Sequence, residues 1–192
     1  MFEGMFRDSA IEEMRMASAM HHRTIYMCET VTDDACFKLN YYLDRIERLD
    51  KHSGKKEPIT IVISSFGGSI YDGLSSISRI EKMVEDGYEI ISIIDAYAMS
   101  MGSALSQVCS KRYARRYSTI LYHQPSTYQQ GTCSELKIQF DELMRLWELM
   151  KTITKKHTLM DEEYLESLYK GNKDVYLTAE QCLDFGIIDE IL

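Results

Sequence analysis

A serine in a run of small residues is the first candidate for chemistry in this sequence. Ser100 has Ala98 two residues before it and Gly102 two residues after it, a variant of the G-x-S-x-G pattern. Small neighbours permit a sharp turn from a strand into a helix, and the first amides of a helix favour negative charge. We therefore interpret Ser100 as a candidate nucleophile whose attack creates an oxyanion, with Ser103 as a second candidate. The alternative role for a serine in such a turn is packing or capping.

A serine nucleophile also needs a base, a group that orients the base, and donors for the oxyanion. His123 follows an apolar run and precedes Pro125, and Asp174 lies in a polar turn. The pair Gly67-Gly68 follows another apolar run, where glycine backbone can approach a ligand closely and present an N–H group. Each of these candidates also has a purely structural alternative. His123 could be a structural histidine, Asp174 a solvated turn residue, and Gly67-Gly68 a structural turn. The order Ser–His–Asp differs from that in chymotrypsin, subtilisin and the α/β-hydrolases, so those templates do not explain this chain.

Apolar periodicity predicts the elements that must position these residues. Strands and helices alternate along the chain, which indicates an α/β class. Capping boxes at Ser9 and Thr178 predict the starts of the first and last helices. A long helix is predicted at 134–157, with an apolar stripe that we expect to be core or subunit contact: Leu136, Phe140, Leu143, Trp147 and Met150. Strands are predicted near 24–28, 59–63, 90–95, 116–122 and 187–191, and other helices near 36–46, 70–85, 101–108 and 161–169.

Composition limits the class of protein and its partners. The 192 residues are 45% hydrophobic and 27% charged, as expected for one globular domain with a sizeable core. A net charge of −8 argues against nucleic acid and anionic membranes as main partners. The five cysteines, an odd number without C-x-x-C spacing, predict reduced and buried thiols in a cytosol-like compartment. Charges interrupt the first residues, and no apolar run approaches ~20 residues, so we expect no signal peptide and no membrane span.

Several separate segments together resemble the ClpP family, the proteolytic subunits of Clp proteases. The likeness extends from about residue 23 to residue 192, and the spacing of the motifs makes it specific. The segments are Ser64-Ser65-Phe66-Gly67-Gly68-Ser69-Ile70, Ala98-Met99-Ser100-Met101-Gly102, Tyr122-His123-Gln124-Pro125, the run from Asp174 to Glu180, and Phe185-Gly186-Ile187-Ile188-Asp189.

The resemblance implies a site and a fold. By it, Ser100 is the nucleophile, His123 the general base and Asp174 its orienter, while the amides of Gly68 and Met101 form the oxyanion hole. The implied fold is the ClpP/crotonase-like spiral of ββα units, here as one peptidase domain over 1–192. Residues 1–23 are then an N-terminal helical segment, and about 124–157 are a handle region.

The resemblance also implies an activity and partners. The activity is a serine endopeptidase that cleaves unfolded polypeptides inside a chamber of seven-membered rings, with two rings stacked. A Clp-type ATPase would unfold and deliver the substrates. A cytoplasmic location is implied, with no cofactor, no metal, and neither nucleic acid nor membrane as partner.

Some positions depart from the family pattern. Phe66 replaces a proline, and Val175 replaces an arginine used between rings. Thr60 and Val62 stand where aromatic residues help to receive the unfoldase, and 126–133 replaces a glycine-rich strand. These departures indicate a divergent member, of the kind carried by phages or mobile elements. They leave open a non-proteolytic scaffold or regulatory subunit, and also a crotonase-like acyl-CoA enzyme, which has no need for the Ser–His–Asp set.

Overall fold

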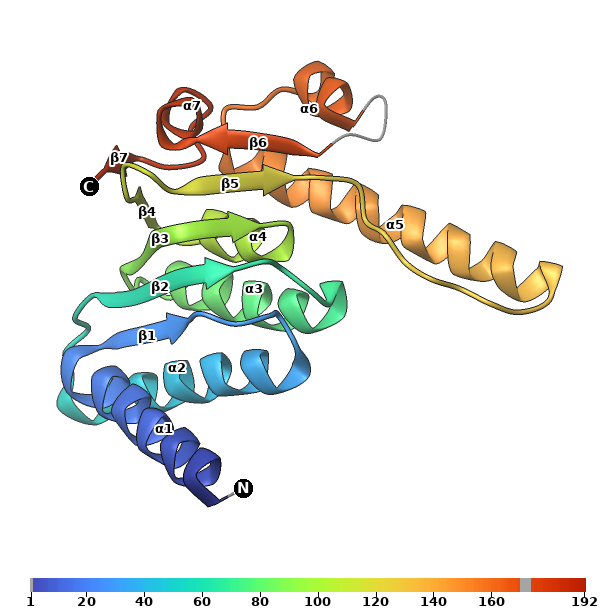
Figure 1. The fold of residues 1–192 in the computed structure, drawn as a ribbon. Coiled ribbons are helices and arrows are strands. Elements are labelled where there is room, and N and C mark those ends of the chain that lie inside the picture. Colours follow the sequence, from blue (N-terminus) through green and yellow to red (C-terminus); the bar gives the residue numbers. More distant parts are fainter. Residues whose placement is uncertain (1, 170–173) are drawn as a thin grey trace.

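A mostly parallel β-sheet organises the chain (Figure 1). The computed structural model describes residues 2–169 and 174–192, with only the backbone for 2–9, 168 and 169. The main path of the sheet runs β1 (Thr24–Met27), β2 (Ile59–Ser65), β3 (Ile90–Met99), β4 (Lys111–Ala114) and β7 (Glu190–Ile191). From this path β5 (Thr119–Tyr122) pairs parallel with the end of β3 and antiparallel with β6 (Val175–Thr178). The predicted α/β class is confirmed.

Helices follow the first three strands in turn, so the chain repeats a strand–helix unit. β1 leads into α2 (Asp33–Ser53), β2 into α3 (Ile70–Glu85) and β3 into α4 (Met101–Gln107). The remaining helices are α1 (Phe2–His22), α5 (Cys133–His157), α6 (Glu162–Tyr169) and α7 (Ala179–Asp184). Every helix in the described chain is too short or too polar to cross a bilayer.

The core lies between the sheet and these helices. Ile59, Ile61 and Ile63 of β2 alternate with half-buried residues and are almost fully buried against the helices. Leu43 of α2 and Ile80 of α3 are equally buried, as the apolar spacing of both helices requires. Each such side chain contributes roughly 1.5–3 kcal/mol on burial. This core holds the carboxyl ends of β2 and β3, where Gly67, Gly68 and Ser100 follow.

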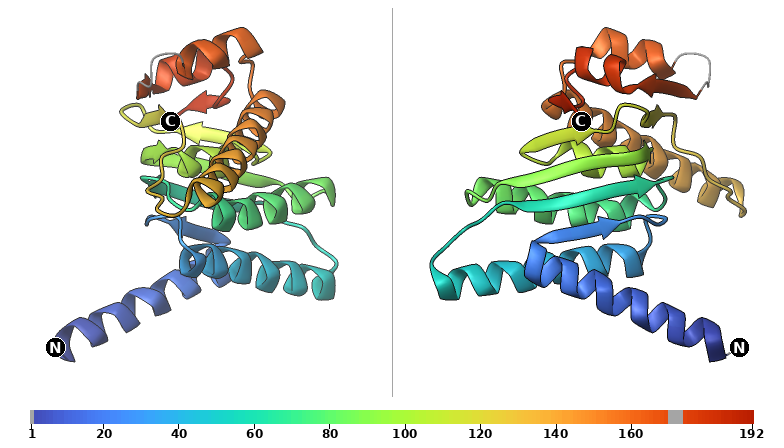
Figure 2. Two further views of the ribbon diagram at one scale, coloured as in Figure 1. Left: turned by 90° about the vertical axis from the view of Figure 1, so that its right-hand side faces the viewer. Right: turned by 60° about the vertical axis from the view of Figure 1, so that its left-hand side comes forward.

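The long helix α5 projects from the body of the domain at one end. Figures 1 and 2 show the first half of α5 extending beyond the sheet, with the loop 123–132 running beside it. The second half packs on the core through Trp147, Met150 and Ile153. The predicted apolar stripe is therefore divided, because its first residues, Leu136 and Phe140, are exposed in the single chain.

Several predicted boundaries are wrong. α1 begins at Phe2, so Ser9 lies inside a helix rather than at its N-cap. The segment predicted as one strand at 116–122 is shorter, and the preceding strand β4 was not predicted. A hydrogen bond from Ser118 N to Arg115 O closes a turn between β4 and β5. In contrast, the box at Thr178 is confirmed as the start of α7.

The cysteine prediction is only partly right. All five cysteines are free, but Cys28 and Cys133 are exposed rather than buried. Burial of the other three is consistent with small apolar side chains, and it raises the pKa of Cys109 and of Cys182 to about 12. Those two thiols therefore stay protonated and unreactive.

Candidate active site

Ser100 occupies the turn between β3 and α4. It has φ 51° and ψ −121°, and among the described non-glycine residues only Arg23 shares a positive φ. Such a backbone costs about 1–3 kcal/mol and persists only where surrounding structure enforces it. Here Ser100 N donates to Leu121 O at 2.9 Å, and Ser103 Oγ donates to Ser100 O at 2.9 Å. These bonds hold the turn so that Ser100 borders a cavity.

The same bonds decide between the two candidate serines. Ser103 is only 2% exposed, and its hydroxyl is used to hold the carbonyl of Ser100. A hydroxyl committed to the backbone in this way is a poor nucleophile. Ser103 is better described as a residue that positions Ser100.

The glycine pair after β2 packs directly against the serine turn. A Cβ at Gly67, which has φ 88°, would lie 2.7 Å from Met99 O and 2.8 Å from Ser100 Cβ. A Cβ at Gly68 would lie 2.2 Å from Val31 O. Only glycine permits backbone to fit between these two neighbours.

Backbone bonds to Val31 hold the glycine pair on its other side. Val31 N donates to Gly67 O at 2.8 Å, and Ser69 N donates to Val31 O at 2.8 Å. These bonds fix the turn without the proline that Phe66 replaces. The Phe66 side chain is exposed, with its ring 4.3 Å from that of Tyr97.

Two backbone amides lie beside Ser100. Gly68 and Met101 line the same cavity as the serine. Met101 is the first residue of α4, so its N–H has no intrahelical acceptor. Helix amides of this kind carry partial positive charge, which favours an anion at this point. The arrangement can therefore stabilise negative charge next to the serine hydroxyl.

His123 and Asp174 approach the serine from another strand pair. The register of β5 with β6 places Tyr122 opposite Val175, so the residues that flank this pair, His123 and Asp174, lie side by side. His123 Nδ1 lies 3.9 Å from Asp174 Oδ1, which is longer than a hydrogen bond. Within the described residues no hydrogen bond joins Ser100 Oγ to His123. Catalytic hydrogen bonds are often long in unliganded enzymes, so this geometry is compatible with a triad that closes on substrate.

Comparison with known proteins identifies the family. A family model described as Clp protease matches residues 9–192, nearly the whole chain. The chain belongs to the Clp protease family. As a Clp protease family member it is a serine-type peptidase, and its α/β fold is consistent with that family.

Curated relatives with Clp protease names are similar to this chain over most of their length. A protein named ATP-dependent Clp protease proteolytic subunit 1 from Chlamydia caviae is 31% identical, covering 88% of this chain and 86% of the relative. One of the same name from Prochlorococcus marinus subsp. pastoris is 29% identical, covering 90% and 85%. An ATP-dependent Clp protease proteolytic subunit from Porphyromonas gingivalis is 29% identical, covering 97% and 81%.

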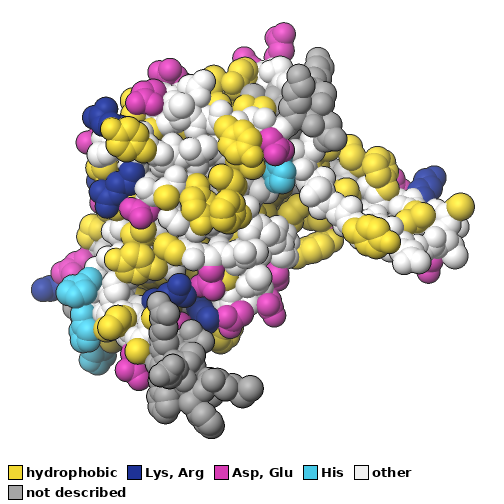
Figure 3. All heavy atoms as spheres, viewed as in Figure 1, with side chains coloured by type: hydrophobic (Ala, Val, Ile, Leu, Met, Phe, Trp, Pro, Cys, Tyr) yellow, Lys and Arg dark blue, Asp and Glu magenta, His cyan; other side chains and the backbone are white. Residues whose placement is uncertain are grey.

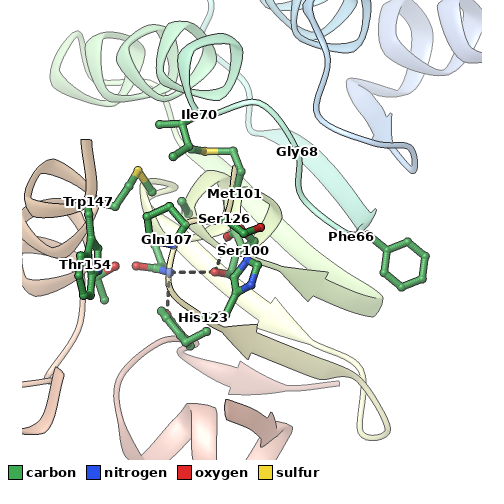
Figure 4. Close-up of a pocket in the computed structure, with 15 residues that line it drawn as sticks. Phe66, Gly68, Ile70, Ser100, Met101, Gln107, His123, Ser126, Trp147 and Thr154 are labelled. Carbon is green, nitrogen blue, oxygen red and sulfur yellow. Dashed lines mark hydrogen bonds between the residues drawn. The ribbon is translucent and has the colours of Figure 1, made fainter. Parts of the chain in front are cut away.

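A cavity of about 380 Å³ opens beside the serine of this Clp protease family member (Figure 4). Its lining begins with Ser100 and His123 and continues to the second half of α5. Most of the other lining residues are apolar, including Ile70, Ala104, Trp147 and Met150. Gln107, Tyr122 and Thr154 add polar groups to this lining. The cavity's volume and mostly apolar lining with a few polar groups are typical of a ligand-binding cavity.

Sequence reasoning did not find part of this cavity. Trp147 and Met150 were predicted only as core or subunit contact, and Thr154 carried no signal. Gln107 had one usable signal, since a glutamine between Ser106 and Val108 is unusual in a short helix that is otherwise apolar or small. Its role depends on α5 packing across α4, which no local pattern encodes.

Proposed function

We propose that this protein is a serine endopeptidase that cleaves unfolded polypeptides through an acyl-enzyme at Ser100. The observation that carries the proposal is the strained Ser100 turn, which opens on a cavity shared with His123, Gly68 and Met101. Such a turn presents a hydroxyl at the start of a helix, as a nucleophile requires.

Each residue then has one task in the reaction. Ser100 Oγ attacks the peptide carbonyl carbon while His123 takes its proton, and the Gly68 and Met101 N–H groups donate to the oxyanion. The C–N bond then breaks, and His123 gives the proton to the leaving amine. Water attacks the ester by the same route and releases the second product. Asp174 orients the imidazole and stabilises its charged form.

We also propose that the protein works as seven-membered rings, two of them stacked through the handle 124–157. Figure 3 shows exposed apolar side chains on the projecting part of the molecule, which supports this proposal. Ile138 and Phe140, both in the first half of α5, are 69% and 57% exposed. An apolar surface of this kind marks an interface. The relatives described above are named ATP-dependent Clp protease proteolytic subunits. We therefore propose a Clp-type ATPase as the partner that delivers unfolded chains. The single domain over 1–192, its helical segment 1–23 and the cytoplasmic location stay predictions.

A non-proteolytic scaffold or regulatory subunit is the second candidate. One observation favours it: the 3.9 Å separation of His123 from Asp174, together with the missing Ser100–His123 bond among described residues. A subunit that no longer cleaves has no need to keep these contacts short.

A fluorophosphonate probe distinguishes the two candidates. The purified protein is first sized by native mass spectrometry, then treated with the probe, and the modified residue is located by peptide mapping. We expect labelling at Ser100 in a ring-sized assembly that also cleaves a short fluorogenic peptide. An intact ring with neither labelling nor cleavage would support the scaffold. Cleavage by a monomer would contradict the ring proposal alone.

A further inference from the structure

A buried amide lies in the wall of the cavity. Gln107 is 1% exposed on α4, and its Nε2 donates to Tyr122 Oη at 2.7 Å. The same nitrogen lies 3.5 Å from Ser103 Oγ. The other end of the amide, Oε1, is buried and has no hydrogen-bond partner among the described residues. Buried polar atoms are nearly always paired, so an orphaned acceptor in a cavity wall needs an explanation.

The position of Gln107 relates this acceptor to the reacting serine. Gln107 is the last residue of α4, two turns after Ser100, which directly precedes that helix, and both residues line the cavity. Figure 4 shows the Gln107 amide between Ser100 and His123 on one side and Trp147 and Thr154 on the other. A peptide whose carbonyl lies at Ser100 can therefore place the side chain of that same residue, called P1, along Trp147 and Met150.

We propose that Gln107 is a specificity-determining residue, which makes the protein favour P1 side chains with an apolar body and a hydrogen-bonding tip, tyrosine above phenylalanine. The proposal rests on the peptidase function proposed above. Ile70, Trp147 and Met150 provide contacts for the apolar body, while the amide of Gln107 pairs with the tip. A phenylalanine fills the same space but leaves the Gln107 oxygen without a partner in a site from which it excludes water.

The size of the preference follows from one neutral hydrogen bond. We expect kcat/KM for a P1 tyrosine to exceed that for a P1 phenylalanine about 3- to 10-fold. A tyrosine hydroxyl both donates and accepts, so the preference depends on the amide being polar and not on a single orientation of it.

The test compares two fluorogenic peptides, Ala-Ala-Tyr and Ala-Ala-Phe amides, that differ only in the hydroxyl. Each is measured with the wild-type assembly, with Gln107→Met, which keeps the length of the side chain, and with Gln130→Met. The last variant makes the same change on an exposed loop residue of the handle, outside the cavity, and each assembly is sized so that only assemblies of wild-type size are compared. We expect the Tyr/Phe ratio to fall to about 1 or below in Gln107→Met and to stay at its wild-type value in Gln130→Met.

The outcomes separate this inference from the proposed function. A wild-type Tyr/Phe ratio of 1 or less overturns the inference, and this measurement does not depend on any variant folding. A preference for tyrosine over phenylalanine that survives in Gln107→Met also overturns it, because another group must then form the hydrogen bond with the tyrosine hydroxyl. If the wild type cleaves neither peptide and the probe does not label Ser100, the proposed function fails and the inference fails with it.

Discussion

The two ends of the candidate triad are built in different ways. At the serine end, glycine backbone, Val31 and the Ser103 hydroxyl surround a strained turn, and close packing leaves it no freedom. At the acid end, the side chain of Asp174 is 54% exposed and lies 3.9 Å from His123. Asp174 also follows directly on 170–173, outside the described residues.

This difference shows which parts of the site a single chain can complete. Ser100 and the nearby amides of Gly68 and Met101 depend on contacts within this chain, so we expect their arrangement to be preformed. The His123–Asp174 contact depends on an exposed side chain at a sheet edge. We expect that contact to shorten when substrate or neighbouring subunits bind.

The largest expected effect follows removal of the nucleophile. Ser100→Ala should lower peptide cleavage on the order of 10⁴-fold or more, because triad members act as a unit. Cleavage of a fluorogenic peptide is measured on assemblies of equal size. Ser78→Ala, at an exposed serine of α3 outside both the cavity and the handle, is the control and should cleave normally. Near-normal cleavage by Ser100→Ala would refute the nucleophile assignment.

Asp174→Asn should reduce activity strongly without affecting stability. We expect a loss of about 10³- to 10⁴-fold, because the amide favours the wrong histidine tautomer. The melting temperature should stay unchanged, since the Asp174 side chain is half exposed and has no short partner. Activity and thermal unfolding are compared with Asp184→Asn, an exposed residue of α7. A clear drop in melting temperature would mean that the acid end is as tightly built as the serine end.

Gly67→Ala should damage activity and stability together. The added Cβ would press on Met99 O and on Ser100 Cβ, so we expect a 10- to 100-fold loss of kcat and about 2 kcal/mol lower unfolding free energy. Gly54→Ala is a matched control, because Gly54 also has positive φ (72°) but nothing within 4 Å of the added atom. Equal effects in the two variants would remove the argument from packing against Ser100.

Peptide cleavage should rise with pH through the neutral range. A histidine base acts only when neutral, and histidine side chains change charge between about pH 5 and 8. kcat/KM is measured from about pH 5 to 9 with the assembly checked at each pH. A flat profile with constant assembly would argue against His123 as the base.

The smallest expected effect concerns the C-terminal end of α5, near the cavity. Burial acts to raise the pKa of Glu81, but hydrogen bonds from Lys156 and His157 outweigh it and hold that pKa below the ordinary 4.5. The stabilisation of the fold by ionised Glu81 is therefore fully present above about pH 4.5, the unfolded-state pKa. It is lost as pH falls through the lowered folded-state pKa of Glu81. Glu81→Gln should lower the unfolding free energy by under about 1 kcal/mol at pH 7, as for a partly exposed ion pair.

Chemical denaturation at two pH values checks this prediction. The difference in unfolding free energy between wild type and Glu81→Gln should shrink as pH falls below the lowered pKa of Glu81, because both proteins then carry a neutral side chain at residue 81. A difference that persists in acid would show that shape, not charge, sets the effect.

Sequence alone determined the parts of this protein that depend on local residue types. Small residues around Ser100 predicted its turn, Gly67-Gly68 predicted close backbone approach, and alternating apolar segments predicted the α/β class. The motif spacing also identified the family, which the comparisons confirmed. These signals succeed because turn geometry and apolar periodicity act within a few residues.

Only the tertiary structure decided what depends on distant segments. The four-residue strand β4 is too short to show a period, so pairing with β3 and β7 reveals it. The register of β5 with β6 brings Asp174 beside His123, 51 positions away in the sequence. Gln107 becomes part of the cavity beside Ser100 because the second half of α5 packs across α4. Burial, register and side-chain direction arise from packing between elements, which no local pattern of residues specifies.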